Sequence, residues 1–98
     1  MNAKLQTIQK LLREHKDILL NEYKVEKIGI FGSVARGDDH VGSDVDILVE
    51  FSEPVGFFHY LALEGFLHTL LHETVEVVTV RALKHTIREQ VLSETVYV

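Results

Sequence analysis

The sequence predicts a small α/β or α+β domain in which a mixed sheet of about three to four strands is flanked by helices. Two observations predict it. Segments with apolar residues at helical spacing alternate with short β-branched runs, and turns rich in glycine separate them. In chain order the elements read helix, strand, strand, helix, strand, helix. The chain has 98 residues, of which 46% are hydrophobic, so we expect one domain with one core over residues 1–98.

The first predicted helix covers residues 3–22, where Leu5, Ile8, Leu12 and Leu19 recur at helical spacing. The first strand is "VEKIGIF", residues 25–31, which ends at a glycine. The segment "GSVARG", residues 32–37, is long enough for about one helical turn. Loop-forming residues follow in "DDHVGS", residues 38–43.

The second predicted strand is "DVDILVEF", residues 44–51. Side chains alternate between the two faces of a strand, so residues of the same parity share a face. The apolar odd positions predict the core face, and the even positions predict the opposite one. The odd positions are Val45, Ile47, Val49 and Phe51, and the even positions are Asp44, Asp46, Leu48 and Glu50.

The second half of the chain predicts a helix over residues 57–72, a strand over 74–80 and a last helix over 81–95. The aromatic residues of the first of these helices are predicted to form core, with an interface patch as the alternative; they are Phe57, Phe58, Tyr60 and Phe66. The last helix is predicted to turn four apolar residues inward, namely Leu83, Ile87, Val91 and Leu92.

Composition excludes several kinds of function. The formal charge is −5, from 15 acidic and 10 basic residues, which disfavours broad contact with a nucleic-acid backbone. There is no cysteine, so disulfides, thiol nucleophiles and thiolate zinc sites are excluded. The N-terminal segment is charged throughout, and no apolar run approaches the roughly 20 residues of a membrane span. We therefore expect a cytoplasmic protein that binds neither nucleic acid nor membrane.

The turn after the first strand has the chemistry of a phosphate site. Gly32 allows the backbone to approach a ligand closely, and free amides at the start of a helical turn attract anions. Ser33 adds a hydroxyl group, and Arg36 can pair with phosphate oxygens. A glycine–serine pair alone is more often a simple strand–turn–helix connection with a serine cap, so the motif needs support from elsewhere in the chain.

The two aspartates at the start of the second strand supply that support. Asp44 and Asp46 project from the same face, with Cα atoms about 6.5–7 Å apart. Carboxylate oxygens in this arrangement suit Mg²⁺ or Mn²⁺, which complete their shells with water and substrate phosphates. The alternative is a pair of solvated aspartates, but aspartate is depleted in strands and two on one face repel.

The two motifs together predict nucleotidyl or phosphoryl transfer. Six residues separate Gly37 from Asp44, which is room for a loop that returns the chain to a neighbouring strand. The glycine–serine turn and the carboxylates then lie at the same edge of the sheet. Phosphoryl transfer requires positioned phosphates, a metal that neutralises developing charge, and an activated attacking oxygen.

The stretch "GSVARGDDHVGSDVDILVEF" resembles the signature of the nucleotidyltransferase superfamily related to DNA polymerase beta. The fuller pattern, Gly-Ser-x-Ala-Arg-Gly followed by Ser-Asp-x-Asp, resembles the minimal nucleotidyltransferases, the MNT or MntA-like antitoxin family. The later "TVEVVTVRALKHTIREQVLSETVYV" is similar to the C-terminal strand and helix of those proteins, so the resemblance covers nearly the whole chain. It implies a nucleotidyltransferase-like fold.

The resemblance also implies roles for individual residues. The family uses a third carboxylate, on a later strand, as a metal ligand and activator of the nucleophile, and the matching position is Glu76. Aspartate is commoner there, and the extra methylene of glutamate could misplace a metal. The implied catalytic and metal-binding residues are Asp44, Asp46 and Glu76, and the implied nucleotide-binding residues are Gly32, Ser33, Arg36 and Ser43.

The reaction that the resemblance implies transfers AMP from ATP, with one or two Mg²⁺ ions, to a tyrosine of a HEPN-domain RNase toxin. Longer relatives carry a helical domain that binds the acceptor, whereas one helix follows the last predicted strand here. We therefore expect a partner to supply the acceptor surface, in a homo- or hetero-oligomer. Two alternatives remain open: a nucleotidyltransferase-fold module that neutralises its partner by stoichiometric binding, which Glu76 favours, and a subunit that modifies a small molecule such as an aminoglycoside.

Overall fold

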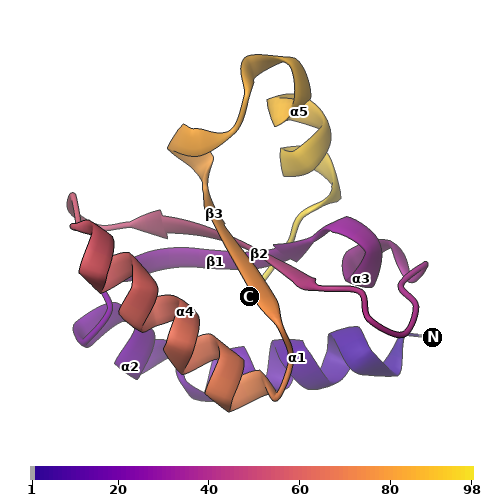
Figure 1. The fold of residues 1–98 in the computed structure, drawn as a ribbon, viewed down its shortest axis with the longest axis horizontal. Coiled ribbons are helices and arrows are strands. Elements are labelled where there is room, and N and C mark those ends of the chain that lie inside the picture. Colours follow the sequence, from indigo (N-terminus) through magenta and orange to yellow (C-terminus); the bar gives the residue numbers. More distant parts are fainter. Residues whose placement is uncertain (1) are drawn as a thin grey trace.

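A computed structural model describes residues 2–98, in which a four-stranded sheet is covered by helices on both faces (Figure 1). Helices α1, α2 and α4 lie on one side of the sheet and α5 on the other. The elements are α1 (Ala3–Glu14), α2 (Lys16–Asn21), β1 (Val25–Phe31), α3 (Gly32–Arg36), β2 (Val45–Phe51), α4 (Phe57–Leu71), β3 (Val75–Thr79), the 3₁₀ turn η1 (Val80–Ala82), α5 (His85–Glu94) and β4 (Val96–Tyr97).

The sheet has the strand order β3-β2-β1-β4. Strand β1 is antiparallel to both β2 and β4, whereas β2 and β3 are parallel. Parallel neighbours need a crossover connection, and α4 supplies it between β2 and β3. The sheet is therefore mixed, and the predicted α/β class is confirmed.

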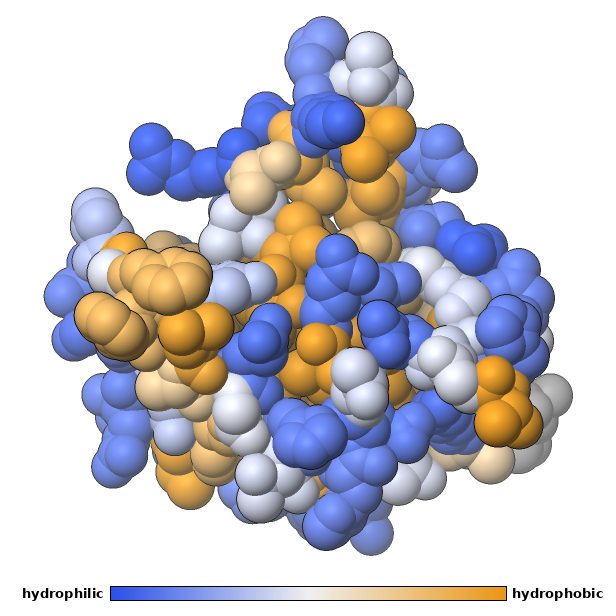
Figure 2. Space-filling view, viewed as in Figure 1, coloured by the Kyte–Doolittle hydropathy of each residue, from blue (hydrophilic) through white to orange (hydrophobic). Residues whose placement is uncertain are grey.

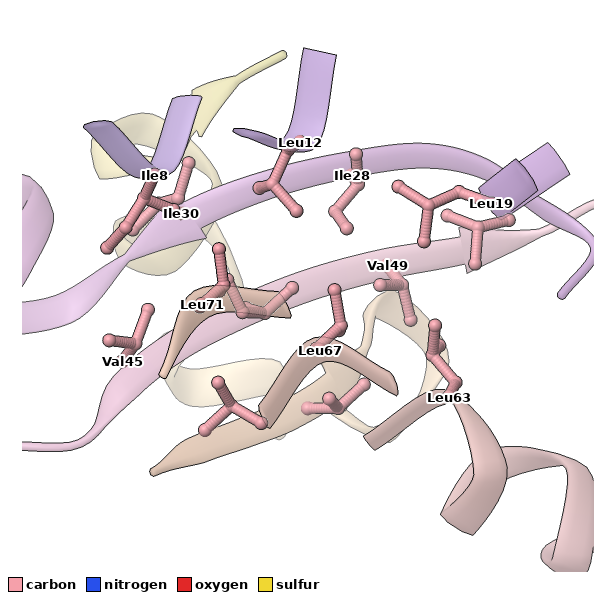
Figure 3. Close-up of a cluster of buried hydrophobic side chains, with 14 of the residues drawn as sticks. Ile8, Leu12, Leu19, Ile28, Ile30, Val45, Val49, Leu63, Leu67 and Leu71 are labelled. Carbon is pink, nitrogen blue, oxygen red and sulfur yellow. The ribbon is translucent and has the colours of Figure 1, made fainter. Parts of the chain in front are cut away.

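The main core fills the space between the sheet and helices α1, α2 and α4 (Figure 3). The apolar odd positions of β2 point into it, as the alternation predicts, and Ile47 is fully buried. Figure 3 shows side chains from α1, α2 and α4 meeting those of the sheet. They include Ile8, Leu12 and Leu19 from α1 and α2, Ile28 and Ile30 from β1, and Leu63, Leu67 and Leu71 from α4.

The opposite face of the sheet is covered only in part. A smaller cluster of Leu48, Leu83 and Val91 attaches η1 and α5 to the middle of β2. Asp46 precedes Leu48 on the same face, so the carboxylate lies beside this small cluster and outside the main core. The incomplete cover on this face leaves room for a polar site at the start of β2.

Several predicted boundaries are wrong in detail. The first predicted helix breaks at His15, where the backbone leaves the helical region and α1 gives way to α2. The last predicted helix is a 3₁₀ turn followed, after Leu83 and Lys84, by the shorter α5. The final "VYV" contains the short edge strand β4, which pairs with β1.

Some predicted core residues are exposed. Phe57 and Phe58 are 68% and 84% exposed, and Figure 2 shows apolar side chains gathered at the left, over the start of α4. Ile87, predicted to face inward, is 44% exposed. Leu63 of the same helix is fully buried. Within residues 2–98, none of the helices has the length and apolarity to cross a membrane.

Candidate active site

The site begins at the turn that joins β1 to α3. Phe31 ends the strand in an extended conformation, and Gly32 follows with a φ of +74°, in the left-handed region that favours glycine. The single turn of α3 ends at Gly37, also left-handed, whose N–H group donates to the carbonyl oxygen of Ser33 at 2.9 Å. Left-handed glycines at both ends explain how "GSVARG" forms one compact turn.

Gly32 lies directly against the carboxylate of Asp46. The strands bring them together, because Phe31 and Asp46 are paired across β1 and β2. A Cβ atom placed on Gly32 would stand only 2.0 Å from Oδ2 of Asp46. Only glycine fits here, since any side chain would displace the carboxylate. The glycine–serine turn and the aspartate pair are thus at one edge of the sheet, as predicted.

Asp46 on β2 and Glu76 on β3 are register partners in the parallel pair. Neighbouring strands lie about 4.8 Å apart, so side chains at paired positions on one face are within reach of each other. Asp44 stands two residues before Asp46, just outside β2, and is exposed. The structure therefore brings together Asp46 and Glu76, with Asp44 at the rim.

The electrostatics of this group are unfavourable without a cation. Burial, followed by the negative charges of Glu76 and Asp44, raises the pKa of Asp46 from 3.8 to about 6. The nearby charge of Arg36 opposes this rise but does not cancel it. A half-buried carboxylate crowded by two exposed ones in this way favours the binding of a cation.

The cationic side of the site is Arg36, at the end of α3. Its Nε atom donates to Asp38 at 3.2 Å, and its Nη1 atom donates to Glu94 at 3.3 Å. Hydrogen bonds to these two carboxylates raise the pKa of the guanidinium group. The Arg36 side chain is 47% exposed, so it remains accessible to an anionic ligand. Ser33, in the first turn of α3, is half-buried beside it.

Ser43 closes the loop that precedes Asp44. Its N–H group donates to the carbonyl oxygen of His40 at 2.9 Å, and its hydroxyl oxygen accepts from the N–H group of His40 at 3.0 Å. Lys4 of α1 ties the loop to the turn after α4, because its Nζ atom lies 3.8 Å from Asp39 and 2.6 Å from Glu73. Ser43 thus shapes the loop, and its contact with a nucleotide stays a prediction.

Sequence reasoning missed Glu94. Its Oε1 atom accepts a hydrogen bond from the N–H group of Gly32 at 3.1 Å, although 62 positions separate the two residues. The nearest available signal was the similarity of the C-terminal segment to the family pattern, but no local spacing links Glu94 to the glycine turn. Its position depends on the unpredicted pairing of β4 with β1.

The donor set fits a hard divalent cation that is completed by its substrate. In residues 2–98, no three His, Cys, Asp or Glu side chains stand preassembled as a metal-binding group. What the site offers is the close pair Asp46 and Glu76, with Asp44 nearby. Mg²⁺ is usually held by one or two carboxylates plus water and substrate phosphates, so this partial set suits it.

Comparison with known proteins shows the family to which the chain belongs. The model of the nucleotidyltransferase domain family matches residues 12–98. The protein adenylyltransferase MntA of Thermococcus cleftensis is 42% identical over 94 residues, which is 96% of this chain and 95% of that protein. A candidate protein adenylyltransferase of Methanocaldococcus jannaschii is 35% identical over 96% of this chain and 97% of its own length.

Solved structures of the same fold also resemble this chain. A protein solved as a candidate minimal nucleotidyltransferase has a TM-score of 0.74 and 33% identity, covering 91% of this chain and 93% of its own. A toxin–antitoxin crystal structure with AMP-PNP has a TM-score of 0.68 and 28% identity, covering 94% of this chain and 69% of its own. With the glycine turn against Asp46 and Asp46 against Glu76, these likenesses show that the chain belongs to the nucleotidyltransferase domain family, in the group of MntA-like protein adenylyltransferases.

Proposed function

We propose that this chain is the antitoxin of a toxin–antitoxin pair and transfers AMP from ATP to a tyrosine of a HEPN-domain toxin. The observation that carries the proposal is the contact of Gly32, Asp46 and Glu76, which joins a phosphate-binding turn to a carboxylate pair. The relatives support the choice of AMP and of a protein acceptor. One is a protein adenylyltransferase, and another was crystallised as a toxin–antitoxin with AMP-PNP.

In this proposal the two sides of the site bind different parts of the MgATP substrate. The turn at Gly32 and Ser33 holds the terminal phosphates, together with Arg36, because glycine lets the backbone approach a ligand closely and hydroxyl and guanidinium groups donate to phosphate oxygens. Asp44, Asp46 and Glu76 would hold Mg²⁺, which neutralises charge on the phosphates. Ser43 closes the loop that leads into this carboxylate group.

The transfer step is a substitution at the α-phosphorus of ATP. The tyrosine oxygen of the acceptor forms a bond to that phosphorus, the bond to the bridging oxygen of the β-phosphate breaks, and pyrophosphate leaves. The hydroxyl proton of the tyrosine goes to the carboxylate of Glu76, the side chain farthest from the Gly32 turn in the strand order. Positioning and charge neutralisation supply most of the acceleration.

We expect a protein partner to supply the acceptor surface, because a relative was crystallised as a toxin–antitoxin. A net charge of −5 also favours a basic partner such as an RNA-cleaving protein.

The proposal is tested with α-³²P-labelled ATP, Mg²⁺, the chain and its candidate HEPN partner. We expect label on the partner that disappears when its acceptor tyrosine is changed to phenylalanine.

A second candidate function is neutralisation by binding alone, which the longer side chain of Glu76 favours. That function predicts a tight complex without label, and unchanged neutralisation by Asp44→Asn.

A further inference from the structure

The C-terminal helix reaches back to the phosphate-binding turn through one carboxylate. Oε1 of Glu94 accepts from the N–H group of Gly32 at 3.1 Å. The Nη1 atom of Arg36 donates to both oxygens of Glu94, at 3.4 and 3.3 Å. A single carboxylate therefore holds the first and the last residue of α3.

The pairing of β4 with β1 places Glu94 there. Gly29 is paired with Tyr97 and Ile30 with Val96 in an antiparallel register. Continued by two residues, the same register sets Gly32 opposite Glu94. The strands are in close contact, because a Cβ atom on Gly29 would lie 3.0 Å from the carbonyl oxygen of Val96 and 2.5 Å from Cγ2 of Thr95. The pairing of β4 with β1 thus fixes Glu94 beside the turn, so Glu94 is not a freely moving surface group.

On its other side, Gly32 is in contact with Asp46. Glu94, Gly32 and Asp46 form a continuous chain of contacts from α5 to the carboxylates of β2. We propose that Glu94 is a positioning residue, which holds the Gly32–Arg36 turn in register with Asp46 so that phosphate donors and metal ligands keep their spacing. The inference rests on the proposed function, because only a nucleotide gives this spacing a purpose.

The contact with Glu94 leaves part of the Arg36 guanidinium group available to a ligand. Among residues 2–98, Arg36 uses Nε toward Asp38 and Nη1 toward Glu94, and no acceptor is bonded to Nη2. The remaining donors stay available to a phosphate while the rest of the guanidinium is fixed. The side chain of Glu94 is only 19% exposed, in contrast with 47% for Arg36. Glu94, the more buried residue of the pair, therefore acts as the fixed point that holds Arg36.

The first test observes the turn itself. Selective ¹⁵N labelling of glycine gives a spectrum of six residues, in which the Gly32 amide can be assigned by substitution of neighbouring residues. We expect Glu94→Ala to move the Gly32 amide proton upfield, because its hydrogen bond is lost, and Glu94→Gln to leave it near the wild-type position, because the amide oxygen still accepts. Glu89→Ala is the matched control, since Glu89 is exposed on the same helix and loses the same charge.

The second test measures transfer as a function of MgATP concentration. We expect Glu94→Ala to lower kcat by about 10- to 100-fold, because a displacement near 1 Å costs this much, and to raise KM for MgATP. Glu94→Gln should recover most of kcat while KM stays raised, because the Gly32 contact returns but the charge that holds Arg36 does not. This split between kcat and KM separates positioning from a general loss of structure.

Two outcomes would overturn the inference. An unmoved Gly32 amide in Glu94→Ala would show that the hydrogen bond does not hold the turn. Tighter binding of MgATP with unchanged kcat would show that Glu94 competes with phosphate instead of placing its donors. If the wild-type chain transfers no AMP, the proposed function fails, but the glycine spectrum and calorimetric MgATP binding still decide the role of Glu94. If Glu94→Ala does not fold, the same measurements on Glu94→Gln decide it.

Discussion

Glu76 on β3 stands opposite Asp46 on β2, and the two carboxylates face the side of the sheet that α5 covers only in part. This pairing places the third predicted carboxylate where a metal bound to Asp46 could be shared. It also explains the raised pKa of Asp46, because burial and the charge of Glu76 act in the same direction. The relationship leads to predictions for catalysis and for stability.

Shortening and neutralising Glu76 should have different effects on transfer. Glu76→Gln removes the charge and the proton acceptor, so we expect the rate of AMP transfer to fall by about 100- to 1,000-fold. Glu76→Asp keeps the charge and matches the commoner residue of the family, so activity should stay within about tenfold of wild type. Steady-state kinetics with labelled ATP measure both. Equal activity of Glu76→Gln and wild type would remove Glu76 from the mechanism.

Asp46→Asn should stabilise the ligand-free protein at neutral pH while it abolishes transfer. The folded-state pKa of Asp46, about 6, lies above its ordinary value of 3.8, so folding takes up a proton between these values. The contribution of Asp46 to stability is therefore fully present below pH 4 and is lost as the pH rises through 6. After allowance for solvent screening, we expect a gain of about 1–2 kcal/mol for the variant at pH 8.

Urea unfolding of wild type and Asp46→Asn at pH 4 and pH 8 measures this difference. The difference should be small at pH 4, where the carboxyl group is protonated in the folded protein and partly protonated in the unfolded chain. A gain of the same size at both pH values would mean that a packing effect, and not charge, explains the result.

Gly32→Ala should disrupt both the turn and the carboxylate beside it. The new Cβ atom would stand 2.0 Å from Oδ2 of Asp46, at a φ of +74°. We expect a loss of stability of about 2–4 kcal/mol, from the backbone conformation and the displaced carboxylate together, with loss of transfer. Gly42→Ala is the matched control, because Gly42 has a φ of +91° but no atom lies within 4 Å of the place that its Cβ atom would take.

Equilibrium unfolding separates the two glycines. Gly42→Ala should lose only about 1–2 kcal/mol, the cost of the left-handed conformation. Similar losses of stability for both variants would show that the close approach of Gly32 and Asp46 does not add to the cost of the substitution.

Truncations in α4 should confirm which of its faces is buried. Leu63 is fully buried, so Leu63→Ala should cost about 2–5 kcal/mol. Phe58 is 84% exposed, so Phe58→Ala should change the stability by less than about 0.5 kcal/mol. Denaturant midpoints at pH 8 compare the two. A large loss from Phe58→Ala would instead place Phe58 in the core.

The nearness of the glycine turn to the aspartate pair could be predicted because these residues are local in sequence, whereas Glu76 was identified only through the family resemblance. The period of two in β2 identifies the shared face of Asp44 and Asp46, and glycine before serine identifies the turn. The faces of α4 could not be predicted in the same way. Its sequence is apolar on nearly all sides, so periodicity does not distinguish Leu63 from Phe58, and packing against the sheet decides.

Glu94 could not be predicted for a different reason. Its partner, Gly32, is 62 positions away, and the hydrogen bond depends on β4, a strand of two residues that carries too little pattern to be recognised. The break at His15 is similar, because the apolar spacing continues across it while the backbone does not.

We expect the carboxylates beside Gly32 to make this chain an enzyme that modifies its partner. Transfer of label from α-³²P-ATP to a HEPN partner tests this most directly, with wild type and the double variant Asp44→Asn/Asp46→Asn, each with and without Mg²⁺. We expect label only with wild type and Mg²⁺, and mass spectrometry should place AMP on a tyrosine. Equal neutralisation of the toxin by both proteins, with no label on either complex, would contradict it and would identify a protein that acts by binding alone.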